Sequence, residues 1–339
     1  MMQISPETQL FIREHSSDDV RVLALQAKKY PDIDMPTAIT QIAGRKVAAE
    51  KIPSWWEIEK IWYPKHLSLE QCSSEITARY KARLLQGDSL TDLTGGFGID
   101  CSFLATGFKS ATYVERQEEL CEIAAHNFPV LNLNHINIKN EDGVTYLQAM
   151  SPVDCLFLDP ARRNEHGGKT VAISDCEPNV AELEELLLQK ANRVMIKLSP
   201  MLDLSLALKE LKQTQEVHIL SVNNECKELL ILLGQTSPTE ISIHCVNLST
   251  KGTQEEQHFV FTREQEQCSE CTYTDSLETY LYEPNASLLK AGAFRSIAAA
   301  YPVRKLHPNS HLYTSDTFIE NFPGRIFRIV NQCSFNKKE

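Results

Sequence analysis

Hydrophobic and polar positions follow two different patterns along the chain. Over residues 1–86, apolar side chains recur about every 3.6 positions, most clearly in the stretches 20–30 and 38–49. This spacing predicts helices that bury one face, and no strand-like alternation interrupts it. Pro36 and Pro53 stand where two of these helices are expected to begin, because proline fits the first turn of a helix.

The end of this region carries two further local signals. Trp55, Trp56 and Trp62 are the three tryptophans of the chain, and they lie close together in sequence. We expect them to anchor the helical region to the next domain, with stacking on nucleic-acid bases as the alternative. The Ser-x-x-Gln sequence at 68–71 has the form of a capping box and predicts the start of another helix.

From Leu90 to Gly234, short apolar runs alternate with amphipathic stretches. The expected strands are 89–93, 111–115, 136–139, 154–158, 193–198, 216–222 and 228–233. The expected helices are 99–106, 117–127, 143–149, 177–190 and 202–212. Strands that alternate with helices predict a mostly parallel, doubly wound α/β sheet. The last two strands are joined only by residues 223–227, which predicts a hairpin and an antiparallel last strand. Seven strands in this arrangement are typical of the Rossmann-like fold of class I methyltransferases.

The remainder of the chain predicts smaller elements. Two strand-like runs at 240–248 and 257–263 are expected to form a hairpin. A compact α+β segment follows, with a helix at 285–300 and strand-like runs at 302–306 and 325–330. The expected domains are a helical region at 1–86, an α/β domain at 87–264, a small α+β domain at 278–330 and a tail at 331–339.

Composition excludes several classes of protein. Apolar residues make up 42% of the 339 residues and charged residues 23%, as in ordinary globular proteins. No apolar run approaches the roughly 20 residues that span a bilayer, and the first residues do not resemble a secretory signal. The ten cysteines are scattered, and Cys268 and Cys271 form the one CxxC pair, without a second pair at zinc-finger spacing. We therefore expect a reduced, cytoplasmic protein with no membrane segment and no metal site.

The charge is unevenly distributed along the chain. The net charge is −11, but residues 284–339 hold eight Lys or Arg against three acidic residues, a balance of +5. The rest of the chain therefore carries −16. This asymmetry suits an anionic partner such as RNA on one face, with a solvated basic tail as the alternative.

A glycine-rich turn follows the first expected strand. Asp92 precedes Gly96 by four residues and Gly98 by six, which matches the D-x-x-x-G-x-G loop of proteins that bind S-adenosylmethionine (SAM). Glycine lets a ligand approach the backbone, and the helix that begins there presents free N–H groups. A dinucleotide fingerprint would need a third glycine where Cys101 stands. The loop residues expected to bind the cofactor are Asp92, Thr94, Gly95, Gly96 and Gly98.

Acidic residues end the next two strands. Glu115 lies 17 residues beyond Gly98, where a carboxylate can accept hydrogen bonds from both ribose hydroxyls of an adenosine. Asp142 follows the third strand and is expected to accept a hydrogen bond from the adenine amine, a role that Glu141 can also fill.

The sequence Asp159-Pro160-Ala161-Arg162 follows the fourth strand, at the edge where open α/β sheets bind ligands. It resembles the D/N-P-P-x motif of methyltransferases that act on amino groups of nucleobases. There the Asp159 side chain and the Pro160 carbonyl would accept hydrogen bonds from the target amine. Arg162 would hold a phosphate or stack on a base. A plain strand-end turn is the alternative.

Five segments together resemble one family, the THUMP-like class I SAM-dependent RNA methyltransferases. They are Gln71-x-Ser-Ser-Glu-x-Thr-Ala, Asp92-Leu-Thr-Gly-Gly-Phe-Gly, Leu158-Asp-Pro-Ala-Arg, Lys197-Leu-Ser-Pro200 and Glu225-x-Lys-Glu-Leu. The resemblance covers about residues 35–330. It implies SAM as the cofactor, tRNA or rRNA as a partner, and a ferredoxin-like domain at 278–330. It also implies a THUMP-like piece, of which most is expected to be missing after residue 330.

The sequence is also compatible with other functions. Uracil C5 methylation is disfavoured because Leu198 stands where that chemistry needs a cysteine nucleophile. Ribose 2′-O methylation would use Lys81, Asp159, Lys197 and Glu225, with one lysine as the base. The chain can also bind SAM and act on a substrate other than RNA, or be a non-catalytic RNA-binding module.

Overall fold

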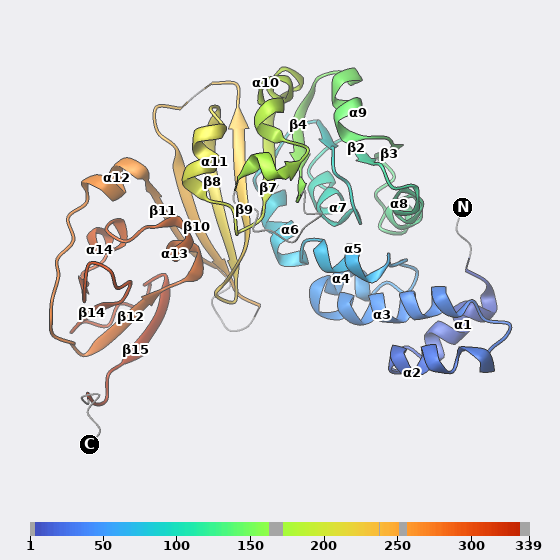
Figure 1. The fold of residues 1–339 in the computed structure, drawn as a ribbon, viewed down its shortest axis with the longest axis horizontal. Coiled ribbons are helices and arrows are strands. Elements are labelled where there is room, and N and C mark those ends of the chain that lie inside the picture. Colours follow the sequence, from blue (N-terminus) through green and yellow to red (C-terminus); the bar gives the residue numbers. More distant parts are fainter. Residues whose placement is uncertain (1–3, 163–171, 237, 251–255, 333–339) are drawn as a thin grey trace. The chain divides into compact units, whose positions relative to one another are not determined.

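The computed structural model describes residues 4–162, 172–236, 238–250 and 256–332 (Figure 1). The chain divides into two compact units. The first comprises Met1–Asp159 with Glu185–Met195, and the second comprises Pro160–Glu184 with Ile196–Glu339. Among the described residues, no helix combines the length and the apolar character that crossing a membrane requires.

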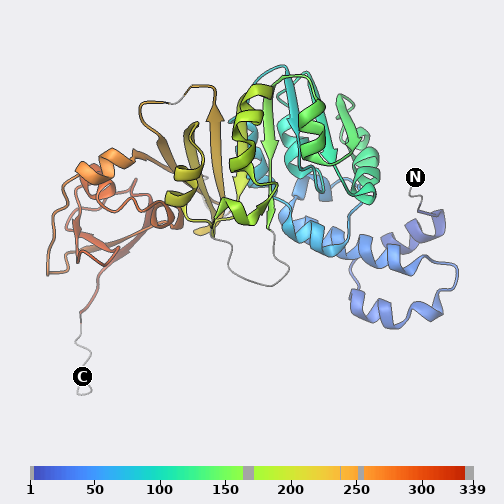
Figure 2. The ribbon, with the colours of Figure 1, turned by 45° about the horizontal axis from the view of Figure 1, so that its top comes forward.

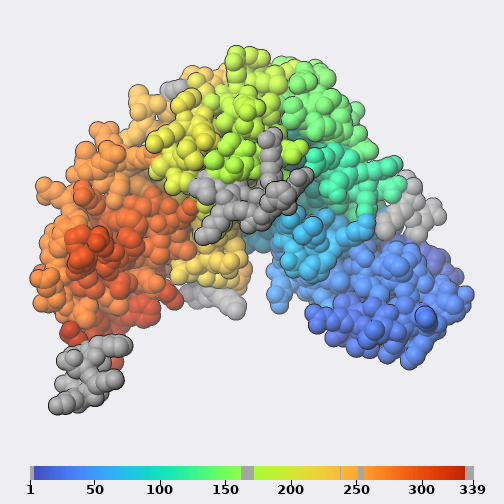
Figure 3. Space-filling model, in the orientation of Figure 1, coloured from blue at the N-terminus to red at the C-terminus, as the bar shows by residue number. Residues whose placement is uncertain are grey.

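The first unit begins with short helices, as the apolar spacing predicts. They are α1 (Pro6–Glu14), α2 (Val20–Leu25), the 3₁₀ turn Ala27–Lys29, α3 (Met35–Lys51), α4 (Pro53–Trp56), α5 (His66–Gln71) and α6 (Glu75–Ala82). Pro36 lies in the first turn of α3 and Pro53 opens α4, so both predicted starts are confirmed. The earliest helices, in blue, form a lobe of their own on the surface (Figure 3).

The capping-box prediction at residues 68–71 is wrong. Helix α5 begins at His66 after Lys65, so Ser68 lies inside the helix and Gln71 ends it. Packing sets this register, because Leu69 is fully buried in the core that also contains Trp55. Tertiary burial therefore outweighs a local capping signal here.

Four parallel strands carry the predicted site in this unit. They are β1 (Ser89–Asp92), β2 (Ser110–Glu115), β3 (Ile136–Asn140) and β4 (Val153–Leu158), in the order β4-β1-β2-β3. The helices between them are α7 (Ile99–Ala105), α8 (Glu118–Val130) and α9 (Gly143–Ala149). Asp92 pairs in register with Tyr113 of β2 and Phe157 of β4, so the carboxyl ends of these strands meet at one edge.

The same sheet continues through β7 (Ala191–Leu198), which follows α10 (Val180–Lys190), into the second unit. That unit contains α11 (Leu204–Glu210), β8 (Thr214–Val222), β9 (Glu225–Gly234), β10 (Ser242–Leu248), β11 (Glu256–Thr262) and α12 (Arg263–Cys268). Strands β8 and β9 form the predicted antiparallel hairpin. Asn223 and Asn224 make its turn with φ values of 51° and 65°, which asparagine tolerates better than most residues.

The sheet has nine strands, in the order β11-β10-β8-β9-β7-β4-β1-β2-β3. All seven strands expected between residues 89 and 233 form, and β9 is the reversed one. The expected hairpin of β10 and β11 also forms, but it joins this sheet because β10 pairs in parallel with β8. The pairing satisfies the backbone of an edge that seven strands would leave open.

The C-terminal segment holds a separate four-stranded antiparallel sheet. Its strands are β12 (Tyr280–Pro284), β13 (Arg304–Lys305), β14 (Tyr313–Ser315) and β15 (Gly324–Arg328), in the order β13-β14-β12-β15. Instead of one helix at 285–300 there are two, α13 (Ala286–Ala291) and α14 (Ser296–Ala300). Gly292 ends α13 in a left-handed conformation with φ of 76°, which breaks the expected helix. The helices α13 and α14, which are labelled in Figure 1, lie close to these strands in both ribbon views (Figure 1 and Figure 2).

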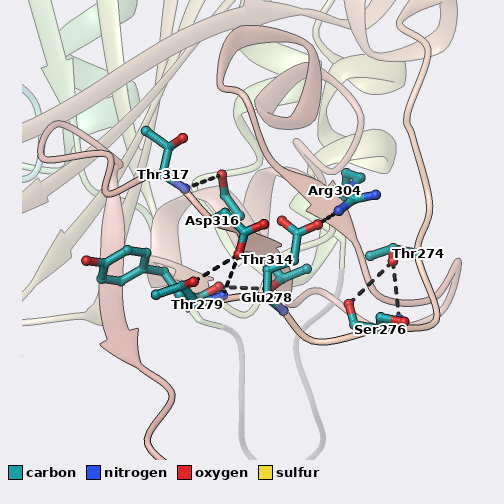
Figure 4. A network of polar contacts seen from close by, with 10 residues as sticks. Thr274, Ser276, Glu278, Thr279, Arg304, Thr314, Asp316 and Thr317 are labelled. Atoms are coloured by element: carbon teal, nitrogen blue, oxygen red, sulfur yellow. Dashed lines mark hydrogen bonds and ion pairs between the residues drawn. The ribbon is translucent and has the colours of Figure 1, made fainter.

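Polar contacts close one end of this small sheet (Figure 4). A carboxylate oxygen of Asp316 accepts hydrogen bonds from the backbone nitrogen and hydroxyl of Thr279 at 3.1 and 2.9 Å. Glu278 forms an ion pair with Arg304, and its backbone nitrogen donates to the hydroxyl of Thr314. These bonds tie the chain before β12 to both β13 and β14. Two minor strands, β5 (Ala161–Arg162) and β6 (Cys176–Glu177), also pair in the second unit, beside the 3₁₀ turn Ile173–Asp175.

Candidate functional site

The glycine loop joins β1 to α7 and is held against β2. The Gly95 nitrogen donates to the Val114 carbonyl at 2.8 Å, and a Cβ atom on Gly95 would fall 2.3 Å from the Tyr113 ring. Gly96 and Gly98 have φ values of 55° and 86°, in the region that favours glycine. A Cβ atom on Gly96 would meet no heavy atom closer than 3.8 Å. The backbone at Gly96 is therefore open to a ligand.

Asp92 ends β1 with a buried carboxyl group. Its Oδ1 accepts a hydrogen bond from the Thr94 nitrogen at 3.0 Å, whereas Oδ2 is buried and has no hydrogen-bond partner among the described residues. Burial raises the pKa of this carboxyl well above its usual value, and the nearby acids Asp100, Asp159 and Glu115 raise it further. An unpaired buried oxygen at a glycine loop marks a place where a ligand can supply the missing partner.

Glu115 ends β2 and turns back onto the glycine loop. Its Oε2 accepts a hydrogen bond from the Gly96 nitrogen at 2.9 Å, and its Oε1 accepts one from the Gln117 nitrogen at 2.8 Å. Each carboxylate oxygen can accept a second hydrogen bond, so two further donors can be held. The side chain is 8% exposed, and its backbone carbonyl accepts from the Glu141 nitrogen after β3.

Asp142 caps the helix that follows β3. Its Oδ1 accepts hydrogen bonds from the nitrogens of Val144 and Thr145, both at 3.0 Å, and from the Thr145 hydroxyl at 3.2 Å. Because Oδ1 accepts the hydrogen bonds that cap α9, the other carboxylate oxygen, Oδ2, would accept a hydrogen bond from an adenine amine. The residue is exposed, and so the position is accessible.

Asp159 is tied to the glycine loop through Thr94. The Asp159 nitrogen donates to the Thr94 hydroxyl at 2.6 Å, and the same hydroxyl lies 3.5 Å from Asp92 Oδ1. The structure thus brings Asp92, Thr94, Glu115 and Asp159 to one edge of the sheet in the first unit. The half-buried Asp159 side chain follows directly after β4.

The remaining predicted catalytic residues belong to the second unit. Pro160 is buried, and Lys197 lies in β7 with 8% of its surface exposed. The backbone of Arg162 lies in β5 and pairs with Cys176. The Arg162 side chain, and the whole of Arg163, lie outside the described residues. Glu225 opens β9, is exposed, and pairs with Lys227 at 2.7 Å.

A buried cluster beside the loop was not expected from the sequence. The fully buried Lys81 of α6 lies 3.0 Å from Asp100 Oδ1 and donates to the Ser73 hydroxyl at 2.9 Å. The Ser73 hydroxyl in turn donates to Asp100 Oδ2 at 2.7 Å. Asp100 lies in the first turn of α7, two residues after Gly98. The cluster therefore fastens the N-terminal helices to the helix that the glycine loop begins.

The acceptors around the loop fit SAM as a ligand. SAM carries an ammonium group, two ribose hydroxyls and an adenine amine, all of which need acceptors such as the unpaired Asp92 oxygen and the Glu115 carboxylate. Together with the strand order and the reversed β9, this edge defines the fold as that of a class I SAM-dependent methyltransferase.

Comparison with known proteins gives the family. A structure described as that of a "putative methyltransferase" from Porphyromonas gingivalis W83 is 34% identical to this chain, with a TM-score of 0.84. The match covers 98% of this chain and 84% of the other. The chain belongs to the family of that protein, and it is a SAM-dependent methyltransferase. A family model described as a ferredoxin-like domain matches residues 280–323, whereas no curated protein matches.

Two other solved structures are similar over about half of the chain. An rRNA methylase from Streptococcus thermophilus is 15% identical with a TM-score of 0.34, and the match covers 47% of this chain and 93% of the other. A "putative methyltransferase" from Streptococcus mutans in complex with SAH is 13% identical with a TM-score of 0.34, covering 47% and 96%. At these scores neither likeness bears on the activity of this chain.

Proposed function

We propose that the chain methylates an exocyclic amine on a base of RNA by direct in-line transfer. The observation that carries this proposal is Asp159, whose backbone is hydrogen-bonded to Thr94 of the glycine loop at 2.6 Å. The first residue of the Asp-Pro motif is therefore attached to the loop that would hold the methyl donor. Pro160 follows it and offers a carbonyl as a second acceptor.

In this proposal the glycine loop and its acids hold SAM, which supplies an electrophilic methyl group. Glu115 accepts hydrogen bonds from the ribose, the unpaired Asp92 oxygen accepts one from the amino-acid end, and Asp142 accepts one from the adenine amine. Gly96 leaves open space beside its backbone for the ligand, whereas Gly95 and Gly98 let the loop pack against the rings of Tyr113 and Phe128.

The acceptors after β4 would position the target amine. An amine on a nucleobase is nearly planar, and its lone pair is delocalised into the ring. Hydrogen bonds to the Asp159 carboxylate and the Pro160 carbonyl favour a pyramidal nitrogen whose lone pair points out of the ring plane. The nitrogen can lose its proton after methyl transfer, so Asp159 orients the amine rather than acting as a strong base. Arg162 would hold a phosphate or stack on a base, and Lys197 would support the substrate from β7.

Features of the C-terminal segment support RNA as the partner. Strand β15 lies at an edge of the small sheet, and Arg325, Phe327 and Arg328 are exposed along it. Phe327 is 44% exposed, and the Arg325 guanidinium lies 5.8 Å from the centre of its ring. Aromatic rings beside arginines suit unpaired bases and phosphates of RNA.

Ribose 2′-O methylation is the second candidate reaction. It requires Lys81, Asp159, Lys197 and Glu225 around one hydroxyl group. Lys81, however, is fully buried and is paired with Asp100 and Ser73, which speaks against its contact with a substrate. Exchange of Lys197 for alanine separates the two reactions, because the 2′-O mechanism demands near-total loss of activity and the amine mechanism a modest one.

One assay tests the proposal against its alternatives. The protein is incubated with SAM labelled in the methyl group and RNA from a strain that lacks the gene, and the RNA is then digested to nucleosides. Label on a base amine supports the proposal, whereas label on the ribose supports the 2′-O reaction. Label on protein or a small molecule alone would mean a substrate other than RNA. Saturable RNA binding without SAM binding in calorimetry would leave a non-catalytic RNA-binding module.

A further inference from the structure

Three neighbouring strands of the second unit bring histidines together on one face of the sheet. Glu216 and His218 are two residues apart on β8, so their side chains leave the same face. His244 of β10 lies directly opposite His218 in the parallel register. His258 of β11 pairs with Val246, two residues beyond His244, and therefore shares this face.

The potential ligand atoms of these side chains are close to one another. Those of Glu216, His218 and His244 lie within 4.8 Å of one another. His218 Nε2 is 3.3 Å from Glu216 Oε2, and His244 Nδ1 is 3.1 Å from His258 Nε2. Zinc binds imidazole nitrogen and carboxylate oxygen at about 2.0–2.2 Å, so neighbouring ligands in a tetrahedral site lie roughly 3.3 Å apart. The two separations match the length of two edges of such a tetrahedron. His258 is not among the three residues whose ligand atoms lie within 4.8 Å of one another, so its ring must move towards Glu216 and His218 to complete the site.

We propose that Glu216, His218, His244 and His258 bind one divalent transition-metal ion of the zinc type. Imidazole and carboxylate together favour zinc, cobalt and nickel over calcium and magnesium, which prefer oxygen alone. The rings of His218 and His244 stack with centres 4.3 Å apart. Binding would require one of these two rings to turn, so that one nitrogen of His218 and one nitrogen of His244 face the ion.

The ion would act on the edge of the sheet. It bridges β8, β10 and β11, and β11 is the last strand in the order. A ligand that binds the folded chain and not the unfolded one stabilises the fold in proportion to its affinity. The four residues belong to the second unit and the glycine loop to the first, so the proposal does not depend on the reaction that the enzyme performs.

The test uses the full chain, freed of metal with a chelator and titrated with zinc chloride in a calorimeter. We expect one saturable site with micromolar or tighter affinity, and a thermal midpoint that rises by several degrees with zinc. Cobalt chloride in place of zinc is expected to give the visible absorption of cobalt bound to nitrogen. No saturable binding of either metal would overturn the proposal.

Variants assign the site to these residues. His258→Ala changes an exposed side chain, so the fold is kept, and zinc affinity is expected to fall at least tenfold. His244→Ala is expected to abolish binding. His307→Ala removes an exposed histidine elsewhere, and Cys268→Ser removes half of the CxxC pair, so both are expected to bind zinc as the wild type does. Equal affinity in the wild type and in His258→Ala would contradict the proposal even if His244→Ala failed to fold.

Discussion

The buried carboxyl group of Asp92 makes the free energy of unfolding depend on pH. Burial raises the pKa of its carboxyl well above the usual value, so the folded chain holds the proton over a pH range in which the unfolded chain has released it. The stability associated with this proton is full below the unfolded pKa and is lost as the pH rises through the folded pKa. This is the reverse of the behaviour of a carboxyl group in an ion pair.

Asp92→Asn tests this linkage. Asparagine keeps an oxygen for the Thr94 nitrogen and cannot ionise. We expect its thermal midpoint, relative to the wild type, to rise steadily as the pH is raised from about 4 towards 8. Melting curves across this range measure the difference, and a constant offset between the two proteins would contradict it. SAM binding is expected to weaken, because an acceptor oxygen is lost.

Glu115 offers a direct test of the cofactor assignment. Glu115→Ala is expected to weaken SAM binding by about 1–3 kcal/mol, the cost of hydrogen bonds to a charged acceptor. Calorimetry with SAM measures it. Glu119→Ala, an exposed acid on the following helix that pairs with Lys65, is the matched control and is expected to bind SAM normally. An unchanged dissociation constant in Glu115→Ala would remove this residue from the site.

Substitutions of Asp159 distinguish the positioning of the target amine from the binding of SAM. Asp159→Asn keeps one acceptor oxygen and is expected to retain some activity, whereas Asp159→Ala is expected to lose on the order of a hundredfold or more. SAM affinity is expected to change little in either variant, because the side chain would face the substrate. Single-turnover methylation of RNA and calorimetry together give both quantities. A wild-type rate in Asp159→Ala would make this Asp-Pro sequence only a turn.

At the scale of elements, the contact between α6 and α7 contains the buried ion pair of Lys81 and Asp100. Lys81→Met would leave the Asp100 carboxylate buried without its cation, so we expect a loss of about 3–5 kcal/mol in the free energy of unfolding. Arg79→Met, on the same helix, breaks an exposed pair with Glu75 and is expected to cost less than about 1 kcal/mol. Denaturant unfolding measures both. Similar losses in the two variants would show that the buried ion pair stabilises the fold no more than the exposed pair does.

The elements differ in how well the sequence predicts them. Alternation and length identify all seven strands between residues 89 and 233, and the acids Asp92, Glu115 and Asp159 stand at strand ends that a parallel sheet must bring to one edge. The sequence does not predict short strands such as β12 and β14, because a run of three to five residues carries little periodic signal. Gly292 falls inside the helix expected at 285–300, because the apolar spacing continues past it and its positive φ cannot be seen in the sequence.

Contacts between residues that are far apart in the sequence cannot be predicted from local sequence patterns. Ser73, Lys81 and Asp100 meet across 27 residues of sequence, and nothing in the spacing of a serine, a lysine and an aspartate predicts it. The histidines of β8, β10 and β11 meet only because of the register between three strands. Spacing rules for zinc sites assume ligands close together in sequence, so they exclude such an arrangement.

At the scale of the whole molecule, the proposed partner must approach a chain of net charge −11. A local basic and aromatic surface on β15 would then carry RNA binding. Phe327→Ala combined with Arg328→Glu is expected to weaken RNA binding tenfold or more and to leave SAM binding unchanged, because stacking and a phosphate contact are lost. Filter binding at two salt concentrations measures it. Lys109→Glu reverses an exposed charge in the first unit and is the control, so an equal effect there would point to general repulsion.

The buried pair of Lys81 and Asp100 also bears on how this gene can be cut and recombined. A gene fragment that starts at residue 87 would encode every side chain assigned to the cofactor. By this criterion it would be a complete SAM-binding domain. It would nevertheless discard Ser73 and Lys81, and the Asp100 carboxylate at the start of α7 would have neither partner. The N-terminal helices are therefore required for the stability of the α/β domain. Evolution can vary their outer surface, but it cannot detach them and transfer the remainder to another protein without first replacing Asp100.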